Sequence, residues 1–173
     1  QQSFFAWRPG AAAGTSVVAD GRRGRMSPQA WLGMGRGGIM GEYVVSRQDV
    51  SLGAAAGTID VASWQATVTW VLTGEEATYA GVTPRRPLGQ GGGAWEVVAR
   101  AGALSIGEEA FPVYADPAVS AEGARELGIG LNGWLLRNVR VMADVVRTTF
   151  RGGAAGGDRD DEIAGFTRFQ VSF

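Results

Sequence analysis

Arginine is the residue type in this sequence with the clearest chemistry. The chain has 173 residues and 16 basic side chains, and all of the basic side chains are arginines. A guanidinium group stays charged at physiological pH and can bind phosphate or carboxylate oxygens through two parallel hydrogen bonds. Arg100, Arg140 and Arg168 lie within segments of alternating polarity. They predict contact with anions, which are either small mobile anions or carboxylates of the same chain.

Composition excludes most other kinds of site. The sequence has no Cys and no His, so thiolate or imidazole metal ligands and Ser-His-Asp triads are excluded. The acidic run at 158–162 lacks the central glycine and the late glutamate of a calcium loop. We therefore expect no enzyme activity, no metal and no cofactor. The net charge of -1 argues against a nucleic-acid partner, because such a partner requires a basic excess.

Alternation with a period of two residues dominates the chain and predicts strands about as long as tilted membrane strands, roughly 9 to 11 residues. The pattern is clear in 61–73, 94–105, 124–135, 139–150 and the segment that ends at Phe173, and weaker in 3–8, 26–34 and 39–48. The sequence thus predicts an all-β fold of about eight strands. We expect residues 1–173 to form a single domain.

The connections between these segments alternate in length. Short turns are expected at 35–38 and 136–138, and long loops at 9–25, 49–60, 106–123 and 151–165. This pattern indicates an antiparallel up-and-down barrel, although the long connection at 74–93 falls on the short-turn side. Across the turn at 136–138, pairing Leu135 with Val139 places Leu131 opposite Ala143 and Asn132 opposite Met142, which keeps one face apolar.

Alternation alone does not distinguish a water-soluble β fold from a membrane barrel. In the soluble fold the apolar face packs inward and the polar face meets water, whereas in the membrane barrel the apolar face meets lipid and the polar face lines the lumen. Phe173 at the end of an alternating strand favours a transmembrane barrel. Charged residues inside the strands also favour a membrane barrel. Four tryptophans lie near segment ends, where they suit interfacial girdles: Trp64, Trp70, Trp95 and Trp134. Arg125 and Arg147 have the opposite parity to the polar face. The residues predicted to line a pore are Glu96, Arg100, Glu126, Asn132, Arg140, Asp144, Arg168 and Gln170.

Five stretches carry a more specific signal: GIMGEYVVSRQDV (38–50), SWQATVTWVLTGEE (63–76), GAWEVVARAGALSI (93–106), LGIGLNGWLLRNVRVMADVVRTTF (127–150) and FTRFQVSF (166–173). In this order they resemble the C-terminal half of the phosphate-selective porin O and P family. The resemblance implies a sixteen-stranded trimeric barrel in the outer membrane of a Gram-negative bacterium, with about half of the barrel supplied by this chain. The sequence differs from the family pattern in having no lysine cluster and one aromatic residue, Trp134, in the turn after Asn132.

Three functions follow as alternatives. The first is a passive channel for small anions such as phosphate, with outer-membrane lipid and further copies of the chain as partners. The second is a small non-conducting outer-membrane barrel that acts as a structural anchor or adhesin. The third is a soluble β-barrel that binds a small ligand, and it requires Val97, Leu131 and Val141 to pack in a dry core. Because eight strands enclose only side chains, the first alternative needs additional strands, from a partner chain or a missing N-terminal half.

Overall fold

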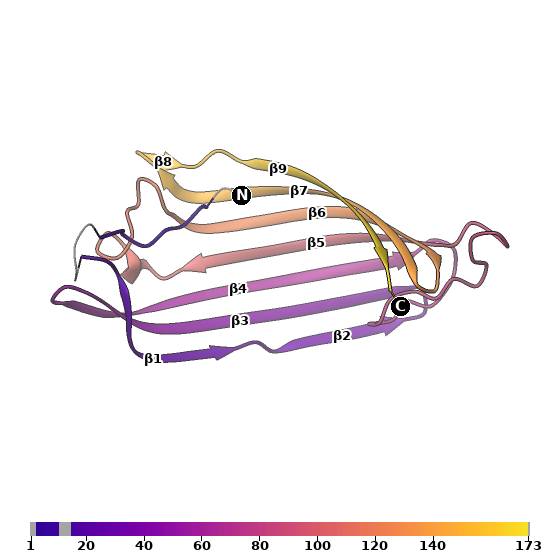
Figure 1. Ribbon diagram of the computed structural model, residues 1–173, viewed down its shortest axis with the longest axis horizontal. Coiled ribbons are helices and arrows are strands. Elements are labelled where there is room, and N and C mark those ends of the chain that lie inside the picture. The colour runs from indigo at the N-terminus through magenta and orange to yellow at the C-terminus, as the bar shows by residue number, and fades with distance from the viewer. Residues whose placement is uncertain (1–2, 11–14, 173) are drawn as a thin grey trace.

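The computed structural model describes residues 3–10 and 15–172, which form one antiparallel β-sheet (Figure 1). Within these residues the strands are β1 (Val18–Met26), β2 (Gln29–Met34), β3 (Gly37–Leu52), β4 (Ala55–Val71), β5 (Ala94–Ile106), β6 (Ala121–Leu136), β7 (Val139–Ala154), β8 (Gly157–Asp158) and β9 (Glu162–Val171). A short 3-10 helix, η1 (Glu108–Ala110), follows β5. The all-β prediction is confirmed.

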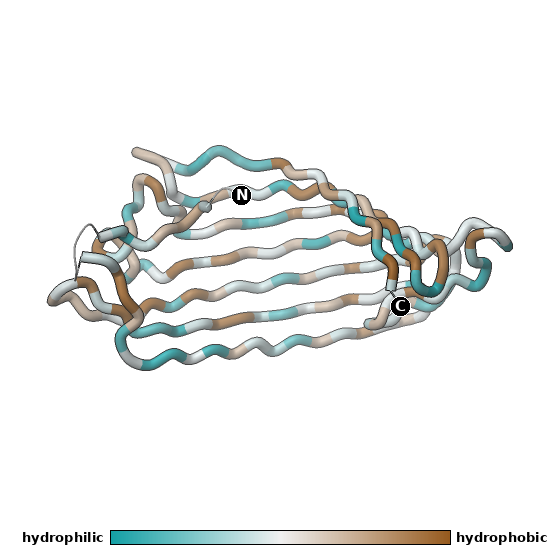
Figure 2. Tube along the Cα trace, in the orientation of Figure 1, coloured by the Kyte–Doolittle hydropathy of each residue, from teal (hydrophilic) through white to brown (hydrophobic). Residues whose placement is uncertain are grey.

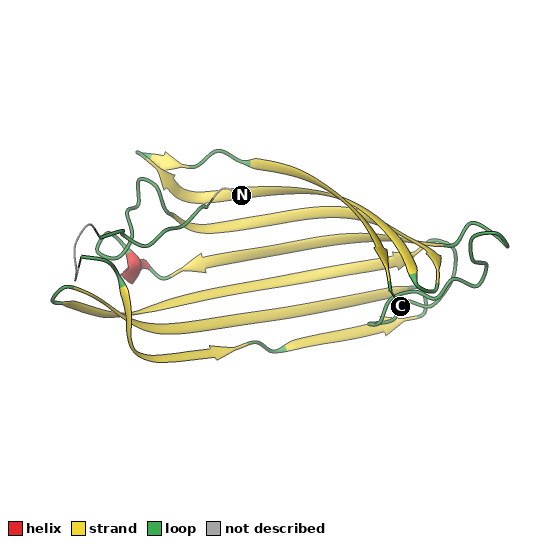
Figure 3. Cartoon of the chain, viewed as in Figure 1, coloured by secondary structure: helices red, strands yellow, loops and turns green. Residues whose placement is uncertain are grey.

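The strands follow one another in chain order across a single curved layer (Figure 3). β1 and β2 both pair with β3 at one edge, and β8 and β9 both pair with β7 at the other. Within the described residues the two edges do not pair with each other, so the sheet is open. Closing this sheet into a barrel requires partners for both edges.

The central strands are long and in continuous register. β3 and β4 contain 16 and 17 residues and pair without a break from Gly37 opposite Trp70 to Leu52 opposite Ala55. Successive side chains of a strand point to opposite faces, and Figure 2 shows hydrophobic and hydrophilic positions recurring along each strand. The two faces of the sheet therefore differ in chemistry along most of their length.

Two small hydrophobic clusters cover opposite ends of one face. At the end that carries the turn at 53–54, Val50, Ile59 and Ile106 are buried beneath Ala110 and Tyr114 of the segment that follows β5. We call this the loop end. At the other end, Val71 and Ala94 are buried against Ala77 and Val82 of the connection between β4 and β5. We call this the turn end.

Several boundaries differ from the sequence-based prediction. Residues 3–8 form a single bridge, from Trp7 to Ala115, in place of the expected strand. The segment 26–34 is divided into β1 and β2 at Ser27 and Pro28, because proline supplies no backbone donor for the ladder. These two differences, with the short β8, replace the eight expected strands by nine among the described residues. Phe173 lies outside the described residues.

Strands extend into three of the predicted long loops. The expected loop at 49–60 is a hairpin whose turn is only Gly53 and Ala54, with Gly53 at a φ of 59° that favours glycine. The expected loop at 151–165 contains the end of β7, all of β8 and the start of β9, and the one at 9–25 contains most of β1. Gly- and Ala-rich sequence suggested loops, but ladder hydrogen bonds use the backbone and tolerate small side chains.

The predicted hairpin register is confirmed except beside the turn. Leu131 lies opposite Ala143 and Asn132 opposite Met142, as expected. The expected pair of Leu135 with Val139 is wrong, because an irregularity between Trp134 and Leu136 places Leu136 opposite Val139. The bulge adds one residue to β6 without changing the faces farther along the hairpin.

Candidate pore-lining site

The ladder register places the eight residues predicted from the sequence on one face of the sheet. Glu96 lies opposite Asn132, Asn132 opposite Met142, and Met142 opposite Arg168. The remaining five follow by the period of two along β5, β6, β7 and β9. We call this the inner face, because the two buried clusters cover its ends, and we call the opposite side the outer face.

Polar contacts on the inner face connect neighbouring strands. Arg100 Nε lies 2.7 Å from Glu126 Oε1. Asn132 Nδ2 donates a hydrogen bond of 2.7 Å to Glu96 Oε2. The sequence placed Glu96 near Arg100 along β5, but each finds its partner across the ladder on β6. The half-exposed pair of Arg100 with Glu126 holds side-chain positions and contributes little net stability.

The arginines near the turn end have a different environment. Arg140 Nη2 donates to Gln170 Oε1 at 3.1 Å, and its guanidinium carbon lies 4.6 Å from the centre of the Trp134 ring. Arg168 follows on the neighbouring strand and is exposed. Among the described residues, no carboxylate pairs with Arg168 and no basic side chain pairs with Asp144. The structure therefore brings Arg140 and Gln170 together and leaves Arg168 exposed.

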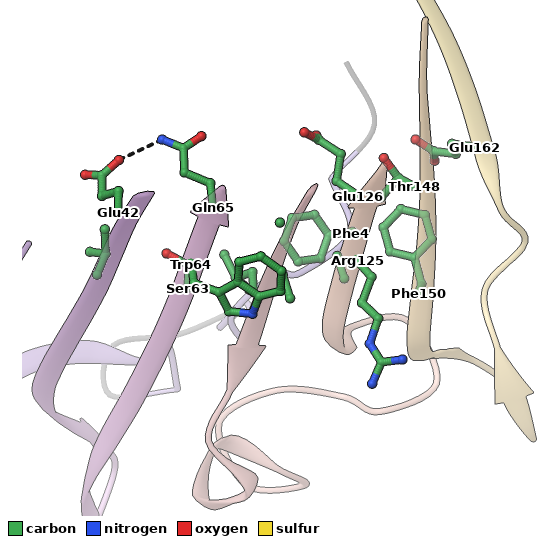
Figure 4. A pocket seen from close by; sticks show the side chains of 15 residues that line it. Phe4, Glu42, Ser63, Trp64, Gln65, Arg125, Glu126, Thr148, Phe150 and Glu162 are labelled. Atoms are coloured by element: carbon green, nitrogen blue, oxygen red, sulfur yellow. Dashed lines mark hydrogen bonds between the residues drawn. The ribbon is translucent and has the colours of Figure 1, made fainter. Parts of the chain in front are cut away.

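Near the loop end the inner face contains an open pocket of about 510 Å³ whose polar groups are mainly acidic. Glu42 accepts hydrogen bonds of 2.7 Å from Gln65 Nε2 and from Ser27 Oγ. Figure 4 shows the carboxylates of Glu42, Glu126 and Glu162 on one side, with the Arg125 guanidinium directed away from them. The sequence-based prediction does not include Glu42 and Gln65 as lining residues, although the alternation along their strands places both on the polar face.

Tryptophan occupies both faces. Trp64 and Trp70 are exposed on the outer face, as a girdle requires. Trp134 is not a girdle residue, because it lies on the inner face beneath Arg140 and packs against the connection between β4 and β5. Gly81 permits this contact, since a Cβ there would come within 2.1 Å of the Trp134 ring. Trp31 packs against the same cluster.

A buried carboxylate organises this connection. Glu75 is 5% exposed, accepts a hydrogen bond from Thr73 Oγ1 and accepts another from the Arg85 backbone N–H at 3.2 Å. Thr73 Oγ1 in turn accepts from the backbone N–H of Trp95 at 3.1 Å. Burial raises the pKa of Glu75, but these hydrogen bonds and the nearby Arg85 charge outweigh it, so the pKa is lowered.

The described residues contain no helix long and apolar enough to span a membrane. They also contain no group of three or more acidic side chains placed to hold a metal ion. Within the acidic run, Asp161 instead pairs with Arg147 at 2.6 Å, and Asp158 accepts from the backbone of Gly152 at 2.7 Å.

Comparison with known families supports the resemblance seen in the sequence. No curated protein matches the chain. A family model described as phosphate-selective porin O and P matches residues 10–173, which is nearly the whole chain. That family consists of channels and not of enzymes, and it implies an outer-membrane location. The chain belongs to the phosphate-selective porin O and P family.

Proposed function

We propose that this chain forms the wall of an outer-membrane channel through which small anions, phosphate among them, diffuse passively. Family membership supports a channel of this class. The observation that carries the proposal is the inner face, where Arg100, Arg140 and Arg168 project from three strands. Among them Arg168 is exposed and has no carboxylate partner among the described residues.

The channel requires strands beyond those described. A sheet edge has unpaired backbone groups, and such groups are not tolerated in hydrocarbon. The free edges at β1–β2 and at β9 must therefore pair with strands of another chain, or of a longer form of this one. Association of copies, which the family resemblance implies, stays a prediction, and mass measurement in detergent tests it.

Within that channel, the eight predicted residues have separate roles. Arg168 and Arg140 attract and bind anions near the turn end. Glu96 with Asn132, and Glu126 with Arg100, hold the polar wall between them. Asp144 opposes the arginines and tunes the anion preference. Guanidinium groups suit this work because they remain charged and present paired donors to oxyanions.

Planar-bilayer recording with a salt gradient tests the proposal. We expect the purified protein to conduct and to prefer chloride and phosphate over potassium. Arg168→Gln should shift the reversal potential toward cations, whereas Asp144→Asn, which removes the opposite charge nearby, should shift it toward anions. Conductance with no change in either variant would contradict the assigned roles.

A specific observation also supports the non-conducting alternative. At the loop end, Phe4 and Phe5 pack with Tyr114 against Ile59 on the inner face. The Phe4 carbonyl accepts from Ala121, and the Tyr114 carbonyl accepts from Arg8, each at 2.8 Å. This layer narrows any lumen, so a folded, membrane-inserted protein without conductance would favour the anchor or adhesin.

A further inference from the structure

The outward side chains of β5 are smaller than those of the two neighbouring strands, so the outer face has a depression along β5. Its outward side chains are small over most of the strand, namely Val97, Ala99, Ala101 and Ala103. On β4 the large flanking residues are Trp64, Val68 and Trp70, with the small Ala66 between the first two, and on β6 they are Leu127, Ile129 and Leu131. All six flanking side chains are exposed. We call this depression the alanine trench.

The trench is apolar, narrow and elongated. A groove of about 500 Å³ occupies its middle, with Ala66, Ala99 and Ala101 as the floor and Leu127 and Ile129 along one side. The neighbouring strands β4 and β6 are about 10 Å apart, and the trench follows β5 for about 20 Å. Along a tilted strand this length covers roughly one leaflet of the hydrocarbon core, about 15 Å.

Charged groups at one end of the trench complete the site. Ala103 is flanked by Trp64 on β4 and by Arg125 on β6, toward the loop end. Arg125 is exposed, and among the described residues no carboxylate pairs with it. Nearby Arg147 and Arg151 are paired with Asp161 and Glu122, at 2.6 and 3.2 Å. The local excess charge is therefore the one on Arg125.

From this arrangement we infer that the alanine trench binds one phosphorylated glycolipid of the outer leaflet. An acyl chain lies along Ala99 and Ala101, and a head-group phosphate accepts hydrogen bonds from Arg125 beside Trp64. Tryptophan prefers the head-group level, which places Arg125 at a suitable depth. Basic side chains at that level attract lipid phosphate.

The loop end identifies the leaflet. There the hairpin of β3 and β4 continues past the apolar band, with Arg47 and Asp60 paired at 3.5 Å on its outer face. Long polar extensions of this kind are typical of the extracellular side of outer-membrane barrels. The trench fits a single acyl chain better than a second copy of the protein, because its floor is the width of β5 and widens onto β4 only at Ala66. The inference rests on the outer-membrane location given under the proposed function.

Native mass spectrometry of the full chain in detergent, titrated with diphosphoryl lipid A, tests the inference. We expect Ala101→Leu, which fills the trench, to weaken binding at least tenfold. Ala143→Leu adds the same side chain on the outer face of β7, one strand beyond the trench wall at Leu131, and should bind as the unchanged protein does. Arg125→Gln should weaken binding about fivefold, the factor expected from roughly 1 kcal/mol per basic residue. Arg86→Gln, in the connection between β4 and β5, should leave it unchanged.

The same titration can also overturn the inference. Equal binding by Ala101→Leu and Ala143→Leu would overturn the trench as the lipid site. Equal affinity for phosphatidylglycerol would overturn the choice of a glycolipid. If Ala101→Leu changes the oligomeric mass and leaves lipid binding intact, the trench is an interface between copies. If the unchanged protein does not conduct in a planar bilayer, the proposed channel function is contradicted, whereas the lipid titration still tests the trench independently.

Discussion

The inner and outer faces of this sheet come from the same strands, yet neighbouring residues differ sharply in environment. On the outer face Val68 and Ile129 are 51% and 62% exposed. On the inner face Gln65, Asn132 and Arg100 each contact a carboxylate. An extended exposed apolar surface is unfavourable in water. The difference indicates that hydrocarbon surrounds the outer face and that water or polar groups fill the inner side.

This result argues against the soluble alternative left open by the sequence. A soluble ligand binder requires Val97, Leu131 and Val141 in a dry core. Instead they lie on the outer face, opposite to the buried clusters, and Leu131 is exposed. Glu96, on the inner face, is buried and hydrogen-bonded. The arrangement is the one expected of a barrel wall in a membrane.

The largest effect is expected when a charge is placed on each face of β4, which tests the difference in environment between the outer and inner faces. Val68→Arg puts a guanidinium on the outer face and should destabilise the inserted protein by about 2 to 4 kcal/mol. Gln65→Arg puts the same group on the inner face beside Glu42 and should change stability by less than about 1 kcal/mol. Urea unfolding from lipid vesicles measures both variants. Equal losses would mean that the two faces meet the same medium.

A smaller effect is expected at Glu75, where the inner face meets the connection between β4 and β5. Its lowered pKa means that the folded protein favours the charged carboxylate, so this stabilisation is present above the unfolded-state pKa and is lost as the pH falls through the folded-state pKa. Glu75→Gln should reduce stability at neutral pH by about 1 to 3 kcal/mol and flatten its acid dependence. Glu76→Gln, at the exposed neighbouring position, is the matched control. An unchanged acid profile in Glu75→Gln would contradict the role of this carboxylate.

The smallest effect is expected for the pair of Arg100 with Glu126. Both side chains are about two-fifths exposed, so solvent screens their attraction. A double-mutant cycle with Arg100→Gln and Glu126→Gln should give a coupling energy of about 0.2 to 1 kcal/mol. A much larger coupling would show that the inner face is drier than the structure indicates.

Sequence parity predicted the faces well, because the period of two is a local property of the backbone. It placed Asn132 opposite Met142 and Arg125 on the face opposite to Arg140, and the ladder confirms both. Strand ends were harder to predict, because ladder pairing continues through residues such as Ala55 and Gly57 that carry no strand signal. Partners across the ladder, such as Glu126 for Arg100, depend on side-chain geometry that spacing does not contain. The girdle prediction for Trp134 rests on its position near a segment end, whereas its parity with Asn132 places it on the inner face, as the ladder shows.

Labelling of single cysteines tests the orientation of the two faces most directly, because the sequence contains no cysteine. Asp144→Cys and Val145→Cys place thiols on adjacent residues of β7 that point to opposite faces. In intact lipid vesicles, a charged water-soluble maleimide should label Asp144→Cys and leave Val145→Cys unmodified. Rapid labelling of Val145→Cys with protection of Asp144→Cys would contradict the account.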